Sequence, residues 1–179
     1  SICTTRLVAG IGVPQLSAII SAREGIGKKK VTLIADGGIK FSGDISKALA
    51  AGADAVMIGS LFAGTKESPG KTIKKNGKYY KSFRGMGSIG AMNKGSADRY
   101  FQTKQKDMSK YVPEGVEGLV KYKGLVDKII FQLIGGLKSS MGYLGSKNIK
   151  TLRIKPKFVK ITKAGFYESM VHNIDQVIK

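Results

Sequence analysis

The sequence predicts an α/β fold in which short parallel strands alternate with helices. Two short, continuous apolar runs, residues 31–35 and 55–58, indicate strands buried on both faces, which is typical of parallel sheets. Each run ends at a glycine-containing turn, and each follows a segment whose apolar residues recur at helical spacing. Because two parallel strands joined by a helix form a right-handed unit, residues 13–62 are expected to fold as α-β-α-β.

Helix signals bound both helices of this unit. The first helix is expected over residues 13–24, with Pro14 near its start. In the second helix, Ser42 is a candidate N-cap, and the charge of Asp44 suits the positive end of the helix dipole. Gly52 is expected to end this helix. The unit cannot bury both faces of its sheet alone, so it needs further strands.

The chain changes character after the second strand. Residues 63–123 are polar and rich in lysine and glycine, and Asn76-Gly77 between two β-friendly runs predicts a tight hairpin. The stretch 85–118 shows no sustained period and is expected to form long loops, which in a compact chain are usually functional. An apolar stripe predicts a core-facing helix over 124–145, and residues 159–162 indicate a last short strand.

Charge is the outlying property of the composition. Lysine and arginine number 31 against 12 acidic residues, a formal net charge of +19. Nucleic-acid-binding proteins share such a balance, but they interleave arginine and aromatic residues at a patch. Here the lysines are scattered and arginine is scarce, so no nucleic-acid partner is expected. The positive field suits an anionic substrate instead.

Composition excludes several other classes of protein. With 42% hydrophobic and 24% charged residues, the chain is not intrinsically disordered as a whole. No apolar run approaches the roughly 18 residues of a membrane span, and no leader is visible, so a cytoplasmic protein without a membrane partner is expected. Cys3 is the only cysteine, which excludes an intrachain disulfide. Because the first residue is not Met, the chain is expected to be part of a longer protein.

Three glycine clusters point to a phosphate. Residues 37–38 and 59–60 follow the two predicted strands, where backbone N–H groups beside helix N-termini suit an anion. A third cluster, residues 85–88, could close over the same ligand. Singly, each cluster could be a tight turn, but together they favour a phosphate site. Asp36 at a strand end could accept the two hydroxyls of a ribose or could cap local N–H groups.

The reactive residue types leave alternatives open. Cys3 is flanked by hydroxyl side chains and followed by Arg6, whose charge would favour the thiolate; a nucleophile and an inert cysteine are equally compatible with this pattern. His172 is the only histidine, which argues against a histidine-based triad. Arg99-Tyr100 is interpreted as an anion-binding or surface pair, and Glu114 and Glu117 as solvated loop acids.

Taken together, the motifs resemble those of the inosine-5′-monophosphate (IMP) dehydrogenase family. The matching segments are SICTTR (1–6), ADGGI (35–39), GADAVMIGS (52–60), RGMGS (84–88), DRYFQ (98–102) and VPEGVEG (112–118). The resemblance covers essentially the whole chain, and the motifs are specific as a set. It implies the C-terminal part of a (β/α)8 TIM barrel with a long catalytic flap insertion, assembled as homotetramers. The implied reaction oxidises IMP to XMP with NAD and requires K+.

The resemblance also implies catalytic roles. Cys3 matches the cysteine that attacks C2 of the purine and forms a covalent thioimidate. The 98–102 motif matches a mobile flap that closes after NADH leaves. Arg99 matches the arginine that activates water for hydrolysis, with Tyr100 and Thr5 assisting.

Binding residues follow from the same matches. Asp36 matches the carboxylate that binds the ribose. The other substrate contacts are those to the phosphate and the base: Ser1, Gly38, Gly59, Ser60, Phe83, Gly85, Met86, Gly87 and Glu114. The NAD contacts are Gly10 and Gly12, and the K+ ligands are Cys3 with Glu168, Ser169 and Met170, the last three supplied by backbone carbonyls to a neighbouring subunit. Phe83 departs from the usual tyrosine, which removes one hydroxyl to the phosphate and costs about 1 kcal/mol. Met170 stands where bacterial relatives often have histidine, a change that backbone ligation would survive.

The expected organisation divides the chain in three. Residues 1–62 hold the last βα units with the catalytic loop, 63–123 the hairpin and flap, and 124–179 a helix and tail that close the barrel. Because the first half of the barrel and most NAD contacts are missing, the chain alone is expected to be inactive. A GMP reductase shares the barrel, the cysteine loop and the DGG segment, but RGMGS and DRYFQ favour the dehydrogenase. A basic nucleic-acid-binding fragment is the remaining alternative, and it predicts salt-sensitive binding.

Overall fold

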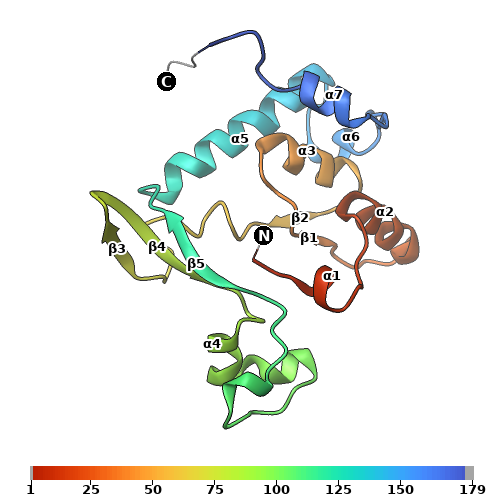
Figure 1. Cartoon of the computed structure of the whole chain (residues 1–179). Coiled ribbons are helices and arrows are strands. Elements are labelled where there is room, and N and C mark those ends of the chain that lie inside the picture. Colours follow the sequence, from red (N-terminus) through yellow and green to blue (C-terminus); the bar gives the residue numbers. More distant parts are fainter. Residues whose placement is uncertain (1, 176–179) are drawn as a thin grey trace.

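Two parallel strands and the helix between them lie at the centre of the fold. The computed structural model describes residues 2–175, and in it β1 (Ile34–Asp36) pairs in parallel with β2 (Ala55–Met57), with α3 (Ser42–Ala50) between them in sequence (Figure 1). The register sets Ala35 opposite Val56. The predicted parallel β-α-β unit is therefore confirmed, and α2 (Gln15–Ile26) precedes it as expected.

Helices cover one face of this small sheet and form the core with it. The predicted stripe lies on α5 (Val126–Tyr143), which packs along α3 (Figure 1) and joins the short α6 (Ile149–Leu152) in the same cluster. The buried apolar residues of this core are Ile19, Ala35, Ile39, Ile45, Ala48, Leu49, Ala53, Leu133 and Leu152. Burial of one face of each helix is what holds these elements together.

The strands are shorter and less buried than predicted. Ala35 is 2% exposed, but Ile34 and Met57 are each 51% exposed. Because side chains alternate along a strand, the covered face carries Ala35 and Val56, and the opposite face carries Ile34, Asp36 and Met57. The prediction of strands buried on both faces is therefore wrong for the described residues.

The start of α3 is fixed by Asp44 and not by Ser42. The N-cap residue is Phe41, and the Asp44 carboxylate accepts the backbone N–H groups of Lys40 and Phe41, both at 3.0 Å. The prediction of Ser42 as the cap is wrong, because the helix begins at Ser42 itself and the acid three residues from the cap reaches back instead. Gly52, with a φ of 117°, follows the end of the helix as expected.

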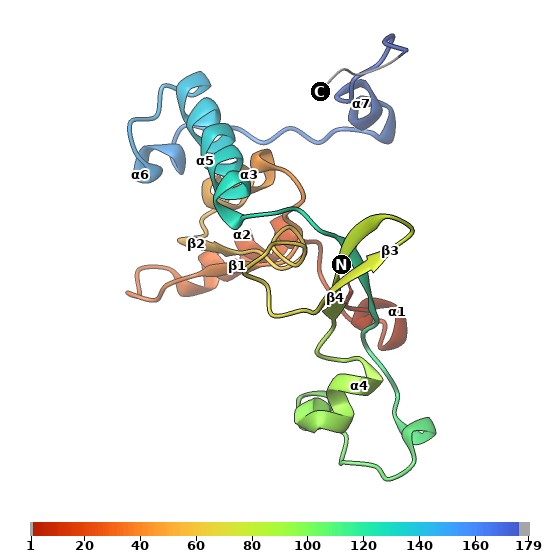
Figure 2. The same cartoon turned by 90° about the vertical axis from the view of Figure 1, so that its left-hand side faces the viewer.

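A second, antiparallel sheet projects from the core (Figures 1 and 2). Its strands are β3 (Thr72–Lys75), β4 (Lys78–Arg84) and β5 (Glu117–Lys121), in that order. The predicted hairpin is confirmed, since Asn76 and Gly77 both have positive φ, 49° and 72°, as its two-residue turn requires. Strand β5 begins inside the predicted loop region, where no local pattern indicated a strand.

Short helical turns occupy the rest of the predicted long loop. They are α4 (Ile89–Ala91), the π turn η1 (Met92–Ser96), and the 3₁₀ turns η2 (Ala97–Tyr100) and η3 (Met108–Lys110). Met92, Ala97 and Tyr111 are buried together and hold this flap region as a small cluster of its own. Turns of three to five residues are too short to leave a readable period, which explains the wrong prediction.

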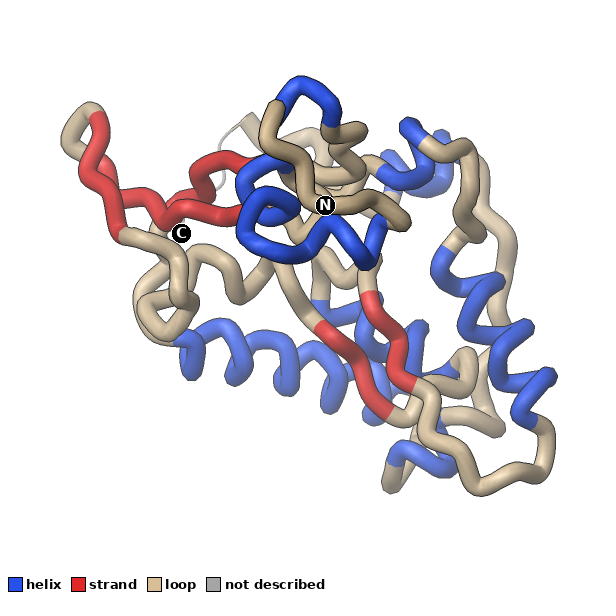
Figure 3. Tube along the Cα trace, turned by 90° about the horizontal axis from the view of Figure 1, so that it is seen from below, coloured by secondary structure: helices blue, strands red, loops and turns tan. Residues whose placement is uncertain are grey.

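The C-terminal prediction also fails. No strand forms at residues 159–162, where Val159 and Ile161 are exposed and lack a partner strand among residues 2–175. The chain continues into the short helix α7 (Lys163–Glu168; Figure 1), whose N-cap Thr162 accepts the N–H of Gly165. Seen from below, the two sheets of the fold appear as two separate groups of red strands (Figure 3). Among the helices of residues 2–175, none has the length and apolar character that a bilayer crossing requires.

Asp54 links the helices and strands at the end of the sheet remote from the glycine turns. Its carboxylate accepts the Leu33 N–H at 2.8 Å and pairs with Arg23 at 2.6 Å and Arg153 at 2.7 Å. The Leu33 N–H and the Arg23 guanidinium lower the pKa of Asp54 to about 2, burial opposes them, and Arg153 adds to the lowering. The carboxylate therefore ties together α2, the start of β1 and the segment after α6.

We expect Asp54→Asn to lower the free energy of unfolding at pH 7 by about 1–2 kcal/mol. Because the folded pKa lies below its ordinary value of 3.8, this stabilisation is complete above pH 4 and disappears as the pH falls toward about 2. Urea unfolding at pH 7 and pH 3 measures it: the variant and the wild-type protein should differ less at pH 3. The control Glu24→Gln should change stability by less than about 0.5 kcal/mol. Equal stability of Asp54→Asn and wild type at pH 7 would refute the role of the carboxylate.

Candidate active site

Three segments far apart in the sequence meet in a ladder of backbone hydrogen bonds. Residues 2–4, 85–87 and 114–116 form it, and we call it the motif ladder because each segment belongs to one of the sequence motifs. The Thr4 N–H donates to the Glu114 carbonyl at 2.8 Å, and the Val116 N–H donates to the Ile2 carbonyl at 2.9 Å. On its other side, residues 114–116 bond to residues 85–87: Gly85 N–H to Val116 O and Glu114 N–H to Gly87 O, both at 3.0 Å.

Glycines allow the three backbones to approach so closely. A Cβ on Gly85 would lie 3.2 Å from the Ile2 carbonyl oxygen, and one on Gly115 would lie 3.2 Å from the same atom. Both distances are tighter than ordinary van der Waals contact. The glycines of the predicted third cluster therefore serve the crossing of the three segments.

Cys3 lies on the exposed side of this ladder, opposite Gly115. Its Sγ and the Oγ1 of Thr5 are 3.2 Å apart, within hydrogen-bond distance for sulfur. Thr5 begins the short helix α1 (Thr5–Val8). The Arg6 guanidinium donates a hydrogen bond to the Val13 carbonyl.

Tyr100 of the flap region lies against the motif ladder. A Cβ on Gly87 would lie 2.9 Å from the Tyr100 Cζ atom, so the ring occupies the space that any side chain there would need. Burial raises the pKa of the Tyr100 hydroxyl, and the Cys3 thiolate raises it further; the Arg99 guanidinium lowers it, and the Glu114 carboxylate adds a smaller increase. The phenol therefore stays protonated near neutral pH. Cys3, Arg99, Tyr100 and Glu114, predicted separately, converge here.

A cleft of about 830 Å³ lies between the segment that follows β2 and the projecting antiparallel sheet. Gly59 and Phe62 line it from the segment after β2, and Phe83 and Arg84 line it from β4. Lys71 and Lys94 add positive charge to its walls. The structure therefore brings together two of the predicted phosphate contacts, Gly59 and Phe83, while the neighbouring Ser60 is exposed next to the cleft.

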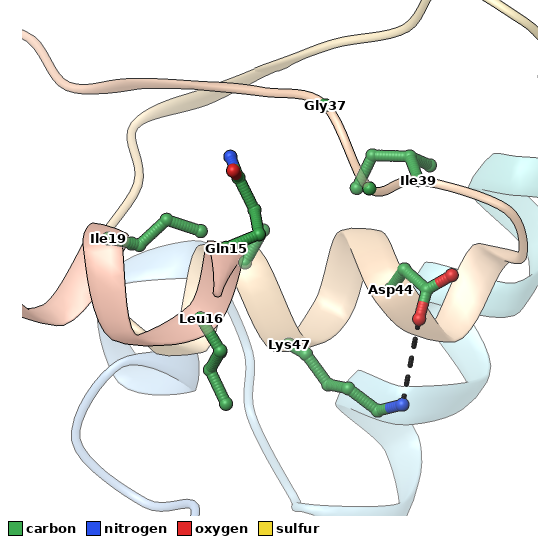
Figure 4. A pocket seen from close by; sticks show the side chains of 9 residues that line it. Gln15, Leu16, Ile19, Gly37, Ile39, Asp44 and Lys47 are labelled. Atoms are coloured by element: carbon green, nitrogen blue, oxygen red, sulfur yellow. Dashed lines mark ion pairs between the residues drawn. The ribbon is translucent and has the colours of Figure 1, made fainter. Parts of the chain in front are cut away.

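The Asp36–Gly38 turn lies at the same sheet edge as Gly59, because the strands are parallel. Asp36 is exposed, and its backbone carbonyl accepts the Nε2–H of Gln15 at 3.0 Å. Gly38 packs over the Gln15 side chain and borders a small apolar cavity of about 110 Å³ between α2 and α3 (Figure 4). This cavity carries no catalytic residue type other than the paired Asp44 and Lys47, so we assign it to packing.

Comparison with known proteins decides the family. Residues 1–172 match the model of the IMP dehydrogenase / GMP reductase domain. The chain belongs to the IMP dehydrogenase / GMP reductase family. Inosine-5′-monophosphate dehydrogenases of Chlorobaculum parvum and Bacillus subtilis are 59% and 57% identical to it over 97% of the chain.

A solved structure is similar over the same range. It is a cysteine-to-alanine variant of a Trypanosoma brucei GMP reductase in complex with guanosine 5′-monophosphate, with a TM-score of 0.85 and 48% identity over 97% of the chain. The chain spans about a third of the length of these relatives, 35–36%. The described part of the chain contributes one parallel β-α-β unit toward the (β/α)8 barrel that the resemblance implies.

The family resemblance implied NAD contacts at Gly10 and Gly12. Both lie in the exposed segment between α1 and α2. No atom lies within 4 Å of a Cβ built on Gly10, so a ligand can approach its backbone. The Arg6 side chain covers Gly12, where a Cβ would meet its Cγ at 2.6 Å, so packing already explains that glycine. The open space beside Gly10 fits the implied dinucleotide contact, whereas the Arg6 side chain already occupies the space beside Gly12.

The implied K+ ligands are divided between two places. Glu168, Ser169 and Met170 lie at the C-terminal end of α7, away from the cysteine loop in both views (Figures 1 and 2). Carbonyls at a helix C-terminus suit a cation, and that of Met170 accepts the His172 ring nitrogen at 2.8 Å. Residues 2–175 contain no cluster of three His, Cys, Asp or Glu side chains suited to a metal. One copy of the chain does not bring Cys3 to these carbonyls.

Ser1 lies outside the described residues. One contact at the site, between Glu117 and Ser88, was not predicted from the sequence. Glu117 was read as a solvated acid, but its Oε1 accepts the hydroxyl of buried Ser88 at 2.8 Å. Ser88 in turn caps α4, accepting the Ala91 N–H at 3.3 Å. The serine before a helical turn was a readable cap signal, whereas the Glu117 contact bridges 29 residues and had none.

Proposed function

We propose that the protein containing this chain oxidises IMP to XMP, with NAD as the hydride acceptor. The observation that supports this best is the motif ladder, in which the Cys3 segment pairs with the Glu114 segment and Tyr100 of the flap lies against Gly87. A nucleophile, a neutral phenol and an arginine at one exposed position suit a reaction that forms a covalent adduct and then hydrolyses it. The family membership supports the same chemistry.

The first half of the proposed reaction belongs to Cys3. Its thiolate adds to C2 of the purine, forming the S–C2 bond, and the hydride on C2 departs, leaving a thioimidate on the enzyme. When bound, NAD supplies the acceptor for that hydride. Thr5, at 3.2 Å from the sulfur, hydrogen-bonds with the thiol group and fixes its direction. The proposed contacts to the base are Met86, Gly87 and Glu114, whose carboxylate lies close enough to Tyr100 to raise the pKa of its hydroxyl.

The second half belongs to Arg99 and Tyr100. Water adds to C2, loses a proton, and expels the Cys3 thiolate as XMP forms. Because its pKa is raised, Tyr100 acts as a hydrogen-bond donor that orients the water and not as a base at neutral pH. Arg99 takes that proton as the base, which requires that its guanidinium first lose a proton in the closed site; Thr5 assists the step.

The remaining contacts are proposed from the cleft and from the chain ends. Asp36 binds the ribose hydroxyls, and Gly38, Gly59 and Ser60 bind the phosphate, with Ser1 and Gly85 completing the nucleotide site. Phe83 contributes only its ring, since it lacks the usual hydroxyl. A K+ ion would be held by the carbonyls of residues 168–170 and Cys3 from two different copies of the chain. This division requires a homo-oligomer, for which we propose a tetramer.

Reduction of GMP is the second candidate function, because the similar solved structure is a GMP reductase with GMP bound. The two activities are separated by supplying the purified whole protein that contains this chain with IMP and NAD, or with GMP and a reduced dinucleotide. We expect XMP and NADH from the first mixture and no ammonia from the second. Release of ammonia and IMP from GMP, without oxidation of IMP, would reject the dehydrogenase and establish the reductase.

A further inference from the structure

We propose that Ser96 and Gln102 are positioning residues that hold the Arg99-Tyr100 turn against the motif ladder. Neither is proposed to touch the reacting atoms; Gln102 ends the DRYFQ motif but has no role assigned above, and Ser96 lies outside the motifs. They lie on the two sides of the turn, and each side chain bonds to backbone on another segment of the site. The inference rests on the proposed function for its kinetic consequence, but its structural part does not.

Ser96 fixes the approach to the turn. Its hydroxyl donates to the Met86 carbonyl oxygen at 2.6 Å, which joins the end of η1 to the 85–88 loop of the motif ladder. Met86 itself is 51% exposed, so packing of its side chain does little to hold the loop in place. The hydroxyl of Ser96 therefore links the start of the turn directly to the loop that would bind the purine.

Gln102 fixes the exit from the turn. Its Nε2–H donates to the Val112 carbonyl at 2.9 Å, and its Oε1 accepts the Val112 N–H at 3.0 Å. One side chain therefore satisfies both backbone groups of Val112, as a neighbouring strand would. Val112 lies two residues before Glu114, so the hydrogen bonds of Gln102 tie the turn to the 114–116 segment of the motif ladder. Tyr111, which is buried, adds a further link by accepting the Gln105 N–H at 2.9 Å.

The backbone between these two anchors is strained, which shows that something must hold it. Phe101 has a φ of 56°, in the left-handed region, and is fully exposed. Its N–H donates to the Asp98 carbonyl, and the Gln102 N–H donates to the Ala97 carbonyl, each at 3.1 Å. This is the pattern of a Schellman helix end, where glycine is usual. An exposed phenylalanine gains no burial there, so the Gln102 clamp is what offsets the strain.

The clamp should matter to one half of the reaction more than the other. Arg99 and Tyr100 act in hydrolysis, whereas addition of the Cys3 thiolate and departure of the hydride use the 2–4 segment. A displacement of the Arg99-Tyr100 turn from the motif ladder by about 1 Å can lower the rate of hydrolysis about 100-fold. Loss of Ser96 or Gln102 should therefore slow hydrolysis and leave the first NADH turnover intact.

The test uses Gln102→Ala and Ser96→Ala in the full protein, with Gln105→Ala and Ser109→Ala as matched controls. The control side chains bond only within their own segment, Gln105 to Thr103 at 3.2 Å and Ser109 to Asp107 at 2.7 Å. The first readout is hydrogen exchange of the peptide containing the Val112 amide, which needs neither substrate nor cofactor. The second is the ratio of the NADH burst to the steady-state rate.

We expect the Val112 amide to exchange at least about 10-fold faster in Gln102→Ala, and the steady-state rate of both variants to fall about 10- to 100-fold. The burst should remain, and Ser96→Thr, which keeps the hydroxyl, should recover most of the rate. Unchanged exchange in Gln102→Ala, or equal loss of burst and steady state, would overturn the proposal. If exchange rises while no variant or wild type oxidises IMP, the clamp stands and the proposed function fails.

Discussion

Replacing Cys3 with alanine is expected to abolish oxidation of IMP, with a fall of at least about 1000-fold in kcat. Cys3 is the only cysteine of the 179-residue sequence, and the proposed covalent bond to the purine forms on its sulfur. Binding of IMP should survive, because the ladder is built from backbone bonds that alanine preserves. The measurement pairs NADH formation at 340 nm with IMP affinity by calorimetry.

Two comparisons make this result specific. Thr5→Val, which removes the hydroxyl beside the sulfur, should lower kcat without abolishing it. Wild-type and Cys3→Ala proteins should unfold at the same urea concentration, since the thiol is exposed. Retention of more than a tenth of the wild-type rate by Cys3→Ala would rule out the covalent route.

Replacing Gly87 with alanine should have the second-largest effect, a loss of about 100-fold in kcat/KM. The added Cβ would lie 2.9 Å from both the Tyr100 Cζ and the Glu114 carbonyl carbon, closer than real Cβ atoms approach. The Glu114 backbone is held by the ladder, so the Tyr100 ring must move. Steady-state kinetics of the variant measures the loss.

Gly43→Ala is the matched control for this substitution. No atom lies within 4 Å of a Cβ at Gly43, which sits on α3 away from the ladder, so its activity should stay at the wild-type level. Normal kcat/KM in Gly87→Ala would mean that Tyr100 does not act from the position seen here.

Local signals in the sequence predicted the elements that local chemistry determines. The Asn76-Gly77 turn was predictable because two successive positive φ values favour those residues. The α5 stripe was predictable because its apolar spacing matches the helical period. Asp44 was placed correctly in the first turn of α3, but its competition with Ser42 for the cap depended on geometry that the sequence does not express.

Pairings between distant segments could not be predicted in this way. Strand β5 is glycine-containing and polar, and only its ladder with β4 makes it a strand. Residues 159–162 have strand composition but meet no partner among residues 2–175, so they stay extended. In both segments the presence or absence of a partner strand, and not the composition, decides whether a strand forms.

The candidate site shows the same division. Cys3 and Asp36 were ambiguous from local chemistry, and the family resemblance supplied their roles. The motif ladder joins residues 2–4 and residues 85–87 to residues 114–116, so its assembly depends on contacts between distant segments and had no local signature. Ser96 and Gln102 were missed because side-chain bonds to distant backbone leave no pattern in the sequence.

The most direct test of the account is mass spectrometry of the peptide that carries Cys3. The protein is mixed with IMP and NAD, quenched in acid within one turnover, digested and compared with a sample quenched after IMP is exhausted. We expect the early sample to carry one purine nucleotide on Cys3 and the late sample to carry none. Formation of XMP with Cys3 unmodified at every time, or with the nucleotide on another residue, would contradict the account.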